Sequence, residues 1–75
     1  MDIMDIYREF CFNTFKFVKS TYNKDYCDPK EAVQNGIQRL LGVGEYVQLL
    51  GADPIRVESD FNFYKGKLEN LLTNE

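Results

Sequence analysis

The chain has 75 residues, a net charge of −3 at neutral pH and 15% aromatic residues, which together indicate one small domain. A chain of this length buries only about 60% of its unfolded surface, so self-association is a common source of additional stability. Histidine is absent and the only cysteines are Cys11 and Cys27, so neither a zinc cluster nor a disulfide framework is suggested.

The first predicted element is a long amphipathic helix over residues 2–24. With successive residues about 100° apart around a helix axis, the apolar side chains fill one arc of roughly 180°, wider than the ~100° that packs against one neighbour. We therefore expect this helix to contact two neighbours, and Asp2 is suited to cap its start. The arc consists of Ile3, Met4, Ile6, Tyr7, Phe10, Cys11, Thr14, Phe15, Phe17, Val18 and Tyr22.

Cys11, Phe12 and Cys27 differ in their position relative to the apolar arc of this helix. Cys11 lies on the apolar arc and is expected to behave as a buried hydrophobe, whereas Cys27 follows the helix and is expected to be a free thiol. A disulfide between the two is the alternative, although their spacing does not favour one. Phe12 points to the polar side, between Lys16 and Lys19. It is an isolated exposed ring, which is ordinary, a ring covered by a loop, or a contact with a second chain or another partner.

The second predicted helix starts at Asp28-Pro29, where an aspartate N-cap precedes a proline at the first helical position. Its apolar face is interrupted at Gly42-Val43-Gly44, after which the apolar residues lie on a face rotated by roughly 100°. A change of phase at two glycines predicts a break. We therefore expect a helix over residues 29–41 and a short helix near residues 44–50, with Gly42 and Gly51 as C-caps.

Asp53-Pro54 repeats the start signal and predicts a last helix over residues 54–72. The expected fold is thus all-α, a single domain over residues 1–75 with three main helices, 2–24, 29–41 and 54–72, plus the short helix near 44–50. Phe63 lies opposite the apolar stripe of the last helix, as Phe12 does in the first. The expected core is Phe10, Phe17, Val18, Val33, Ile37, Leu40, Phe61, Tyr64 and Leu68.

The sequence offers little of the chemistry that enzymes use. Without histidine, a Ser-His or Cys-His pair cannot form, and Glu58 and Asp60 diverge on a helix because they are two positions apart. Gly42-Val43-Gly44 lacks the lysine and the preceding strand of a phosphate loop. We therefore expect no enzyme activity and no catalytic, cofactor or metal site.

The charge distribution bears on partners and on location. The sequence has no block of basic residues, so binding to nucleic acid is not expected. Acidic residues near the start argue against a signal peptide or a membrane span. These features predict a cytoplasmic protein. Frequent Asn, Lys, Ile, Tyr and Phe are typical of AT-rich genomes, which include those of many low-GC bacteria, their phages and large DNA viruses.

The aromatic content points to protein binding. Six phenylalanines and five tyrosines are many for one small core, because each ring buries about 150–250 Å². We expect an interaction module that forms a homodimer or binds a larger protein. The alternative is an acidic inhibitor that mimics nucleic acid, although Arg56, Lys65 and Lys67 interrupt the acidic C-terminal third. The expected partner-binding residues are Phe12, Phe15, Tyr46 and Phe63.

Overall fold

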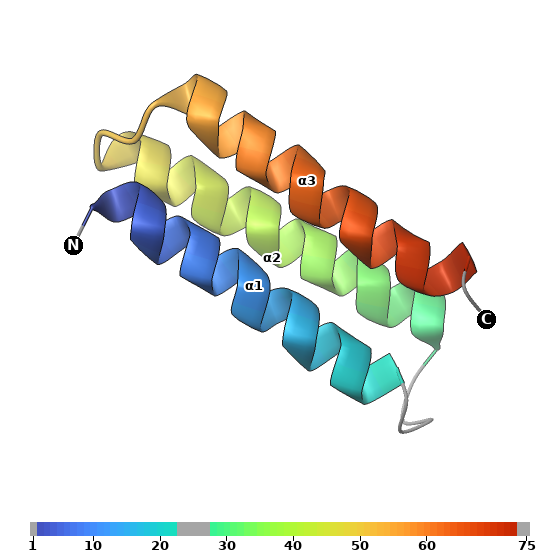
Figure 1. The fold of residues 1–75 in the computed structure, drawn as a ribbon. Helices are drawn as coiled ribbons and strands as arrows, with labels where there is room; N and C mark the ends of the chain where they lie inside the picture. The colour runs from blue at the N-terminus through green and yellow to red at the C-terminus, as the bar shows by residue number, and fades with distance from the viewer. Residues whose placement is uncertain (1, 23–27, 74–75) are drawn as a thin grey trace.

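Three helices form the bundle (Figure 1): α1 spans Ile3–Tyr22, α2 spans Pro29–Leu49 and α3 spans Pro54–Thr73. The computed structural model describes residues 2–22 and 28–73, and this part of the chain contains no strand. The predicted all-α bundle is therefore confirmed, whereas the interpretation of Cys27 falls outside the described residues. The first and third helices run in the same direction and α2 runs against them, so every pair of helices shares one long seam.

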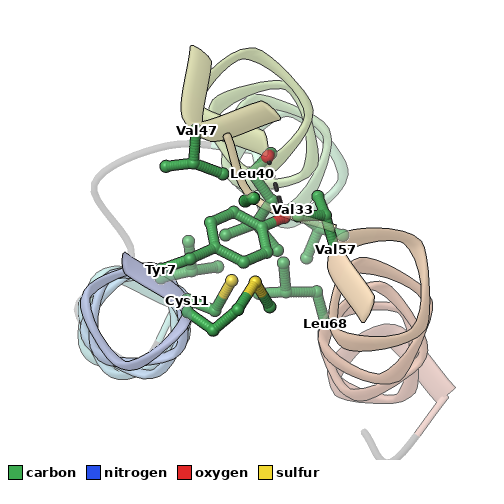
Figure 2. Packing of buried hydrophobic residues seen from close by; sticks show 10 residues of the cluster. Tyr7, Cys11, Val33, Leu40, Val47, Val57 and Leu68 are labelled. Carbon is green, nitrogen blue, oxygen red and sulfur yellow. Dashed lines mark hydrogen bonds between the residues drawn. The ribbon is translucent and has the colours of Figure 1, made fainter. Parts of the chain in front are cut away.

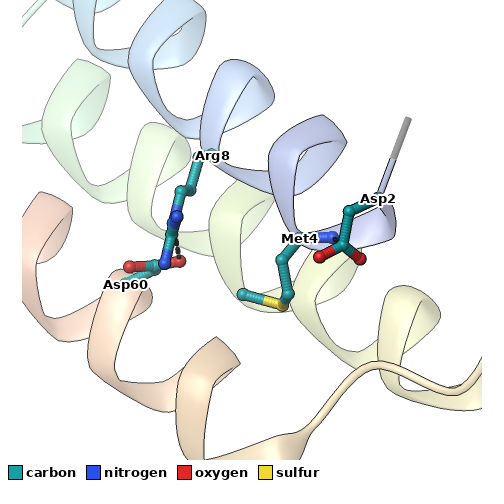
Figure 3. A network of polar contacts seen from close by, with 4 residues as sticks. All are labelled: Asp2, Met4, Arg8 and Asp60. Atoms are coloured by element: carbon teal, nitrogen blue, oxygen red, sulfur yellow. Dashed lines mark hydrogen bonds and ion pairs between the residues drawn. The ribbon is translucent and has the colours of Figure 1, made fainter.

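Each helix begins at an aspartate whose carboxylate accepts a backbone N–H two residues later. The distances are 3.3 Å from Met4 N to Asp2, 3.0 Å from Lys30 N to Asp28, and 3.0 Å from Ile55 N to Asp53. Figure 3 shows the Asp2 carboxylate beside the Met4 nitrogen. These bonds satisfy donors that the first turn of a helix leaves unpaired, and they confirm the predicted starts.

The predicted break in the second helix is wrong, because α2 continues without interruption to Leu49. The predicted short helix near 44–50 is simply its last part. The buried positions of α2 are spaced 3, 4, 4 and 3 apart, so they form one uninterrupted helical stripe. Counting only apolar side chains missed this stripe, because two of its five members are glycines. The stripe consists of Val33, Gly36, Leu40, Gly44 and Val47.

The two glycines of this stripe let the neighbouring helices approach closely. A Cβ atom at Gly36 would lie 2.9 Å from Val18 Cγ2, and one at Gly44 would lie 3.0 Å from the Tyr7 hydroxyl. Both separations are shorter than the 3.5–4.0 Å that is optimal for carbon atoms in contact. Gly42, in contrast, has no atom within 4 Å of its Cβ position.

The second helix ends before Gly51, the position predicted as the C-cap of the short helix, so the predicted C-cap at Gly42 is wrong. Gly51 has a φ of +107°, which favours glycine over residues with a side chain. Its N–H donates to Gln48 O, and the N–H of Ala52 donates to Val47 O, both at 3.0 Å. This pair of bonds is a Schellman motif. Val47 and Ala52 are both buried, as the apolar contact of that motif requires.

The core lies along the axis of the bundle, with contributions from all three helices (Figure 2). Val18, Val33, Leu40 and Leu68 are buried as predicted, and Cys11 is fully buried. The predicted core residues Phe10, Ile37, Phe61 and Tyr64 are partly buried and pack against this core.

The prediction that Phe17 lies in the core is wrong, because 62% of its surface is exposed. The buried positions of α1 form a narrow stripe, spaced alternately 3 and 4 apart, and Phe17 flanks it. The Arg39 guanidinium covers its ring at 5.9 Å from the centroid. The expectation that α1 contacts two neighbours is confirmed, since it packs against both α2 and α3. The buried stripe of α1 consists of Met4, Tyr7, Cys11, Thr14 and Val18.

Candidate protein-binding surfaces

Tyr7 joins the first helix to the second inside the bundle. Its side chain is fully buried, and its hydroxyl donates a hydrogen bond of 3.1 Å to the carbonyl oxygen of Leu40 (Figure 2). The hydroxyl reaches this carbonyl because Gly44, one turn further along α2, has no side chain in its path. A buried hydroxyl without such a partner would be costly, so Gly44 and Tyr7 act as a matched pair.

Cys11 lies one turn after Tyr7 on the same buried stripe. Burial raises the pKa of the Cys11 thiol to about 11, and burial also raises the pKa of Tyr7 above its ordinary value. Both groups therefore remain protonated at neutral pH. Because the thiolate is the nucleophilic form of cysteine, Cys11 serves packing in this position.

The seam between α1 and α3 carries exposed aromatic rings held beside lysines. The ammonium group of Lys67 lies 5.6 Å from the ring centre of Phe15 and 5.1 Å from that of Phe63. On α1, the ammonium group of Lys16 lies 4.9 Å from the ring centre of Phe12. These are cation–π distances. We call this group of residues, Phe12, Phe15, Lys16, Phe63 and Lys67, the aromatic strip.

One ion pair fixes the same seam two turns before Phe15. Arg8 Nε donates to an Asp60 carboxylate oxygen at 2.9 Å, as Figure 3 shows, and the Asp60 side chain is only 19% exposed. The partners are 52 positions apart in sequence, the same separation as between Phe15 and Lys67. This constant separation follows from the parallel direction of α1 and α3.

Two of the four predicted partner-binding residues, Phe15 and Phe63, meet at Lys67 across the α1–α3 seam. Phe12 lies one turn after Arg8 on the same side of α1. Phe12 and Phe63 are 47% and 57% exposed, and Phe15 is partly buried behind Lys67. Tyr46 is 60% exposed but lies on α2, outside the strip. Sequence reasoning found the rings but not their meeting, because a helical wheel does not give the relative register of two helices.

A second surface, between α2 and α3, was not expected from the sequence. It is a groove of about 310 Å³, lined on one side by α2 and on the other by α3, with Tyr7 beneath it. Sequence reasoning treated Gly44 as part of a break, so nothing indicated a hollow at that position. Besides Tyr7, the lining residues are Leu40, Leu41, Gly44, Glu45, Gln48, Pro54, Val57, Glu58, Phe61 and Asn62.

The part of the chain that the structure describes has neither a metal cluster nor a membrane-spanning helix. In residues 2–22 and 28–73, no group of three or more Cys, Asp or Glu side chains is arranged to hold a metal ion. No described helix is long and apolar enough to cross a membrane. No protein-family model, curated protein or solved structure compared with the chain gives a significant match.

Proposed function

We propose that this protein is a non-enzymatic interaction module that binds a protein partner through the aromatic strip. The observation that supports the proposal is that Phe15 and Phe63 meet at Lys67 across one seam, with Phe12 beside Lys16 on the same side of α1, so that each ring lies within 6 Å of an ammonium group. Aromatic residues are enriched at the centres of protein interfaces. Fully burying one exposed ring is worth roughly 1.5–3 kcal/mol, so burying the exposed halves of Phe12 and Phe63 would contribute about that much together.

The lysines of the strip determine which partner surfaces are compatible with it. Lys16 and Lys67 place positive charge over the rings, and like charges opposite each other would weaken a complex. The matching surface is therefore apolar at its centre and carries carboxylates at its edge. A second copy of the chain is the simplest such partner, because its net charge of −3 leaves acidic side chains in excess.

The arrangement of charges favours this function over mimicry of nucleic acid. Asp60 is engaged by Arg8, and Lys65 and Lys67 follow it on the same helix. A mimic would need closely spaced acidic groups that imitate successive phosphates. The mixed charges of α3 are better suited to a protein interface.

The test combines sedimentation equilibrium with pull-down from cells of the native host. We expect Phe12→Ser and Phe63→Ser to abolish self-association, or to remove a protein that the wild type retains. Leu49→Ser is the matched control, because Leu49 is 84% exposed and lies outside the strip. If wild type and both strip variants are monomers that retain identical proteins, the strip has no binding role.

A further inference from the structure

The groove between α2 and α3 has an apolar floor, and Tyr7 is buried beneath this floor. Gly44, Val57 and Phe61 line its lower part. Tyr7 beneath them is fully buried, and its hydroxyl donates its proton to the Leu40 carbonyl. Water on this apolar floor has few hydrogen-bond partners to replace those it has in bulk. An apolar side chain is therefore a better occupant than water.

The rim of the groove is acidic on both sides. Glu45 projects from α2 and Glu58 from α3, and no lysine or arginine is among the described residues that line the groove. Gln48 and Asn62 add one carboxamide on each side. Carboxamides can both donate to and accept from a peptide backbone. The rim is thus complementary to a peptide segment that carries positive charge.

We propose that this groove is a second docking site, which takes a cationic segment of another protein and receives one of its large apolar side chains. The volume of about 310 Å³ lies at the lower end of the roughly 300–1,000 Å³ typical of ligand pockets. It is suited to an anchoring side chain rather than to a whole helix. Lysines or arginines on either side of the anchor would then face Glu45 and Glu58. The docking resembles recognition of amphipathic segments through apolar anchors.

The groove and the aromatic strip carry opposite charges, so the two sites are expected to bind different partners. The strip carries Lys16 and Lys67 and favours acidic partners, whereas the rim of the groove carries carboxylates. The two sites lie on different seams of the bundle, α1–α3 and α2–α3. Variants of one site should therefore leave the other unaffected, and either proposal can fail alone.

The experiment titrates the wild-type chain with a synthetic peptide in which one phenylalanine is flanked by lysines. Binding is followed by heteronuclear NMR, and the expected result is that the amide signals of Gly44, Glu45 and Glu58 shift together. The double variant Glu45→Gln/Glu58→Gln should weaken binding by about three- to tenfold, as expected for the loss of two exposed ion pairs. Higher salt should weaken the wild-type complex more than that of the variant.

Matched controls distinguish the groove from general attraction to an acidic protein. Glu31→Gln/Glu69→Gln removes the same charge from exposed positions outside the groove and should leave the affinity unchanged. A peptide with alanine in place of phenylalanine should bind more weakly to every chain. The proposal is overturned if both double variants weaken binding equally, or if the shifted signals lie elsewhere. It is also overturned if dilution of the chain alone shifts the groove signals, because the occupant would then be a second copy.

Discussion

The two sides of α2 differ in how tightly the same residue types are packed. On the inner side, Leu40 is fully buried and Gly44 contacts the hydroxyl of Tyr7. On the outer side, Leu41 is 42% exposed and Gly42 has open space where a Cβ atom would be. The same two residue types therefore have opposite environments within one turn and a half of one helix.

This contrast shows that the role of a residue in α2 depends on its helical phase rather than on its type. A glycine on the inner side permits close packing, whereas a glycine on the outer side only lowers the stability of the helix. A leucine on the inner side fills the core, whereas one on the outer side is available to the groove. Four substitutions test the contrast, given from the largest expected effect to the smallest.

The largest effect is expected for Leu40→Ala. It removes a fully buried side chain and leaves a cavity, so it should lower the free energy of unfolding by about 2–5 kcal/mol. Leu41→Ala is the control and should cost less than about 1 kcal/mol. Urea denaturation followed by circular dichroism measures both. Equal losses would mean that the two sides of α2 do not differ in packing.

Gly44→Ala should lower the free energy of unfolding by about 1–3 kcal/mol, because the added methyl group overpacks the contact with Tyr7 and Val57. The cost should be smaller in a Tyr7→Phe background, since the hydroxyl that lies nearest to the methyl group is then absent. A double-mutant cycle measures this coupling. Additive effects would show that the hydroxyl does not limit the space at Gly44.

Tyr7→Phe alone should lower the free energy of unfolding by about 0.5–1.5 kcal/mol, the usual net value of a hydrogen bond. The Leu40 carbonyl keeps a partner within the helical ladder, so the substitution leaves no unpaired buried acceptor. Thermal unfolding of the two proteins under the same conditions gives the difference. A loss above about 3 kcal/mol would indicate that the ring itself shifts.

The smallest effect, and the only stabilising one, is expected for Gly42→Ala. Alanine restricts the unfolded chain and favours the helix, so the free energy of unfolding should rise by about 0.5–1 kcal/mol. The paired comparison with Gly44→Ala is made by the same denaturation experiment. Stabilisation by both substitutions, or destabilisation by both, would remove the distinction between the inner and outer glycines.

The sequence correctly predicted where each helix begins, but it did not predict that α2 is continuous. Aspartate-proline pairs determine where α2 and α3 begin, because both residues act locally at the first turn. The break at Gly42–Gly44 was wrong because it was inferred from apolar side chains alone. Gly36 and Gly44 bury backbone rather than side chain, and only the positions of Val18 and Tyr7 reveal this.

The candidate surfaces were predictable only in part, for a related reason. Phe12 and Phe63 could be recognised as exposed rings because each lies opposite the apolar face of its own helix. Their grouping with Phe15 depends on the register between α1 and α3, which is set by long-range packing. The groove depends likewise on the packing of α2 against α3, because both helices line it.

The parallel direction of α1 and α3 has a consequence for folding. Contacts between α1 and α2, or between α2 and α3, join helices adjacent in sequence, whereas Arg8 and Asp60 are separated by 52 positions. Closing a longer loop costs more chain entropy and slows the formation of the contacts that depend on it. The aromatic strip is therefore expected to be completed late, when both terminal helices have docked. A partner that binds the strip would recognise only the fully assembled bundle and would protect it against unfolding by mass action.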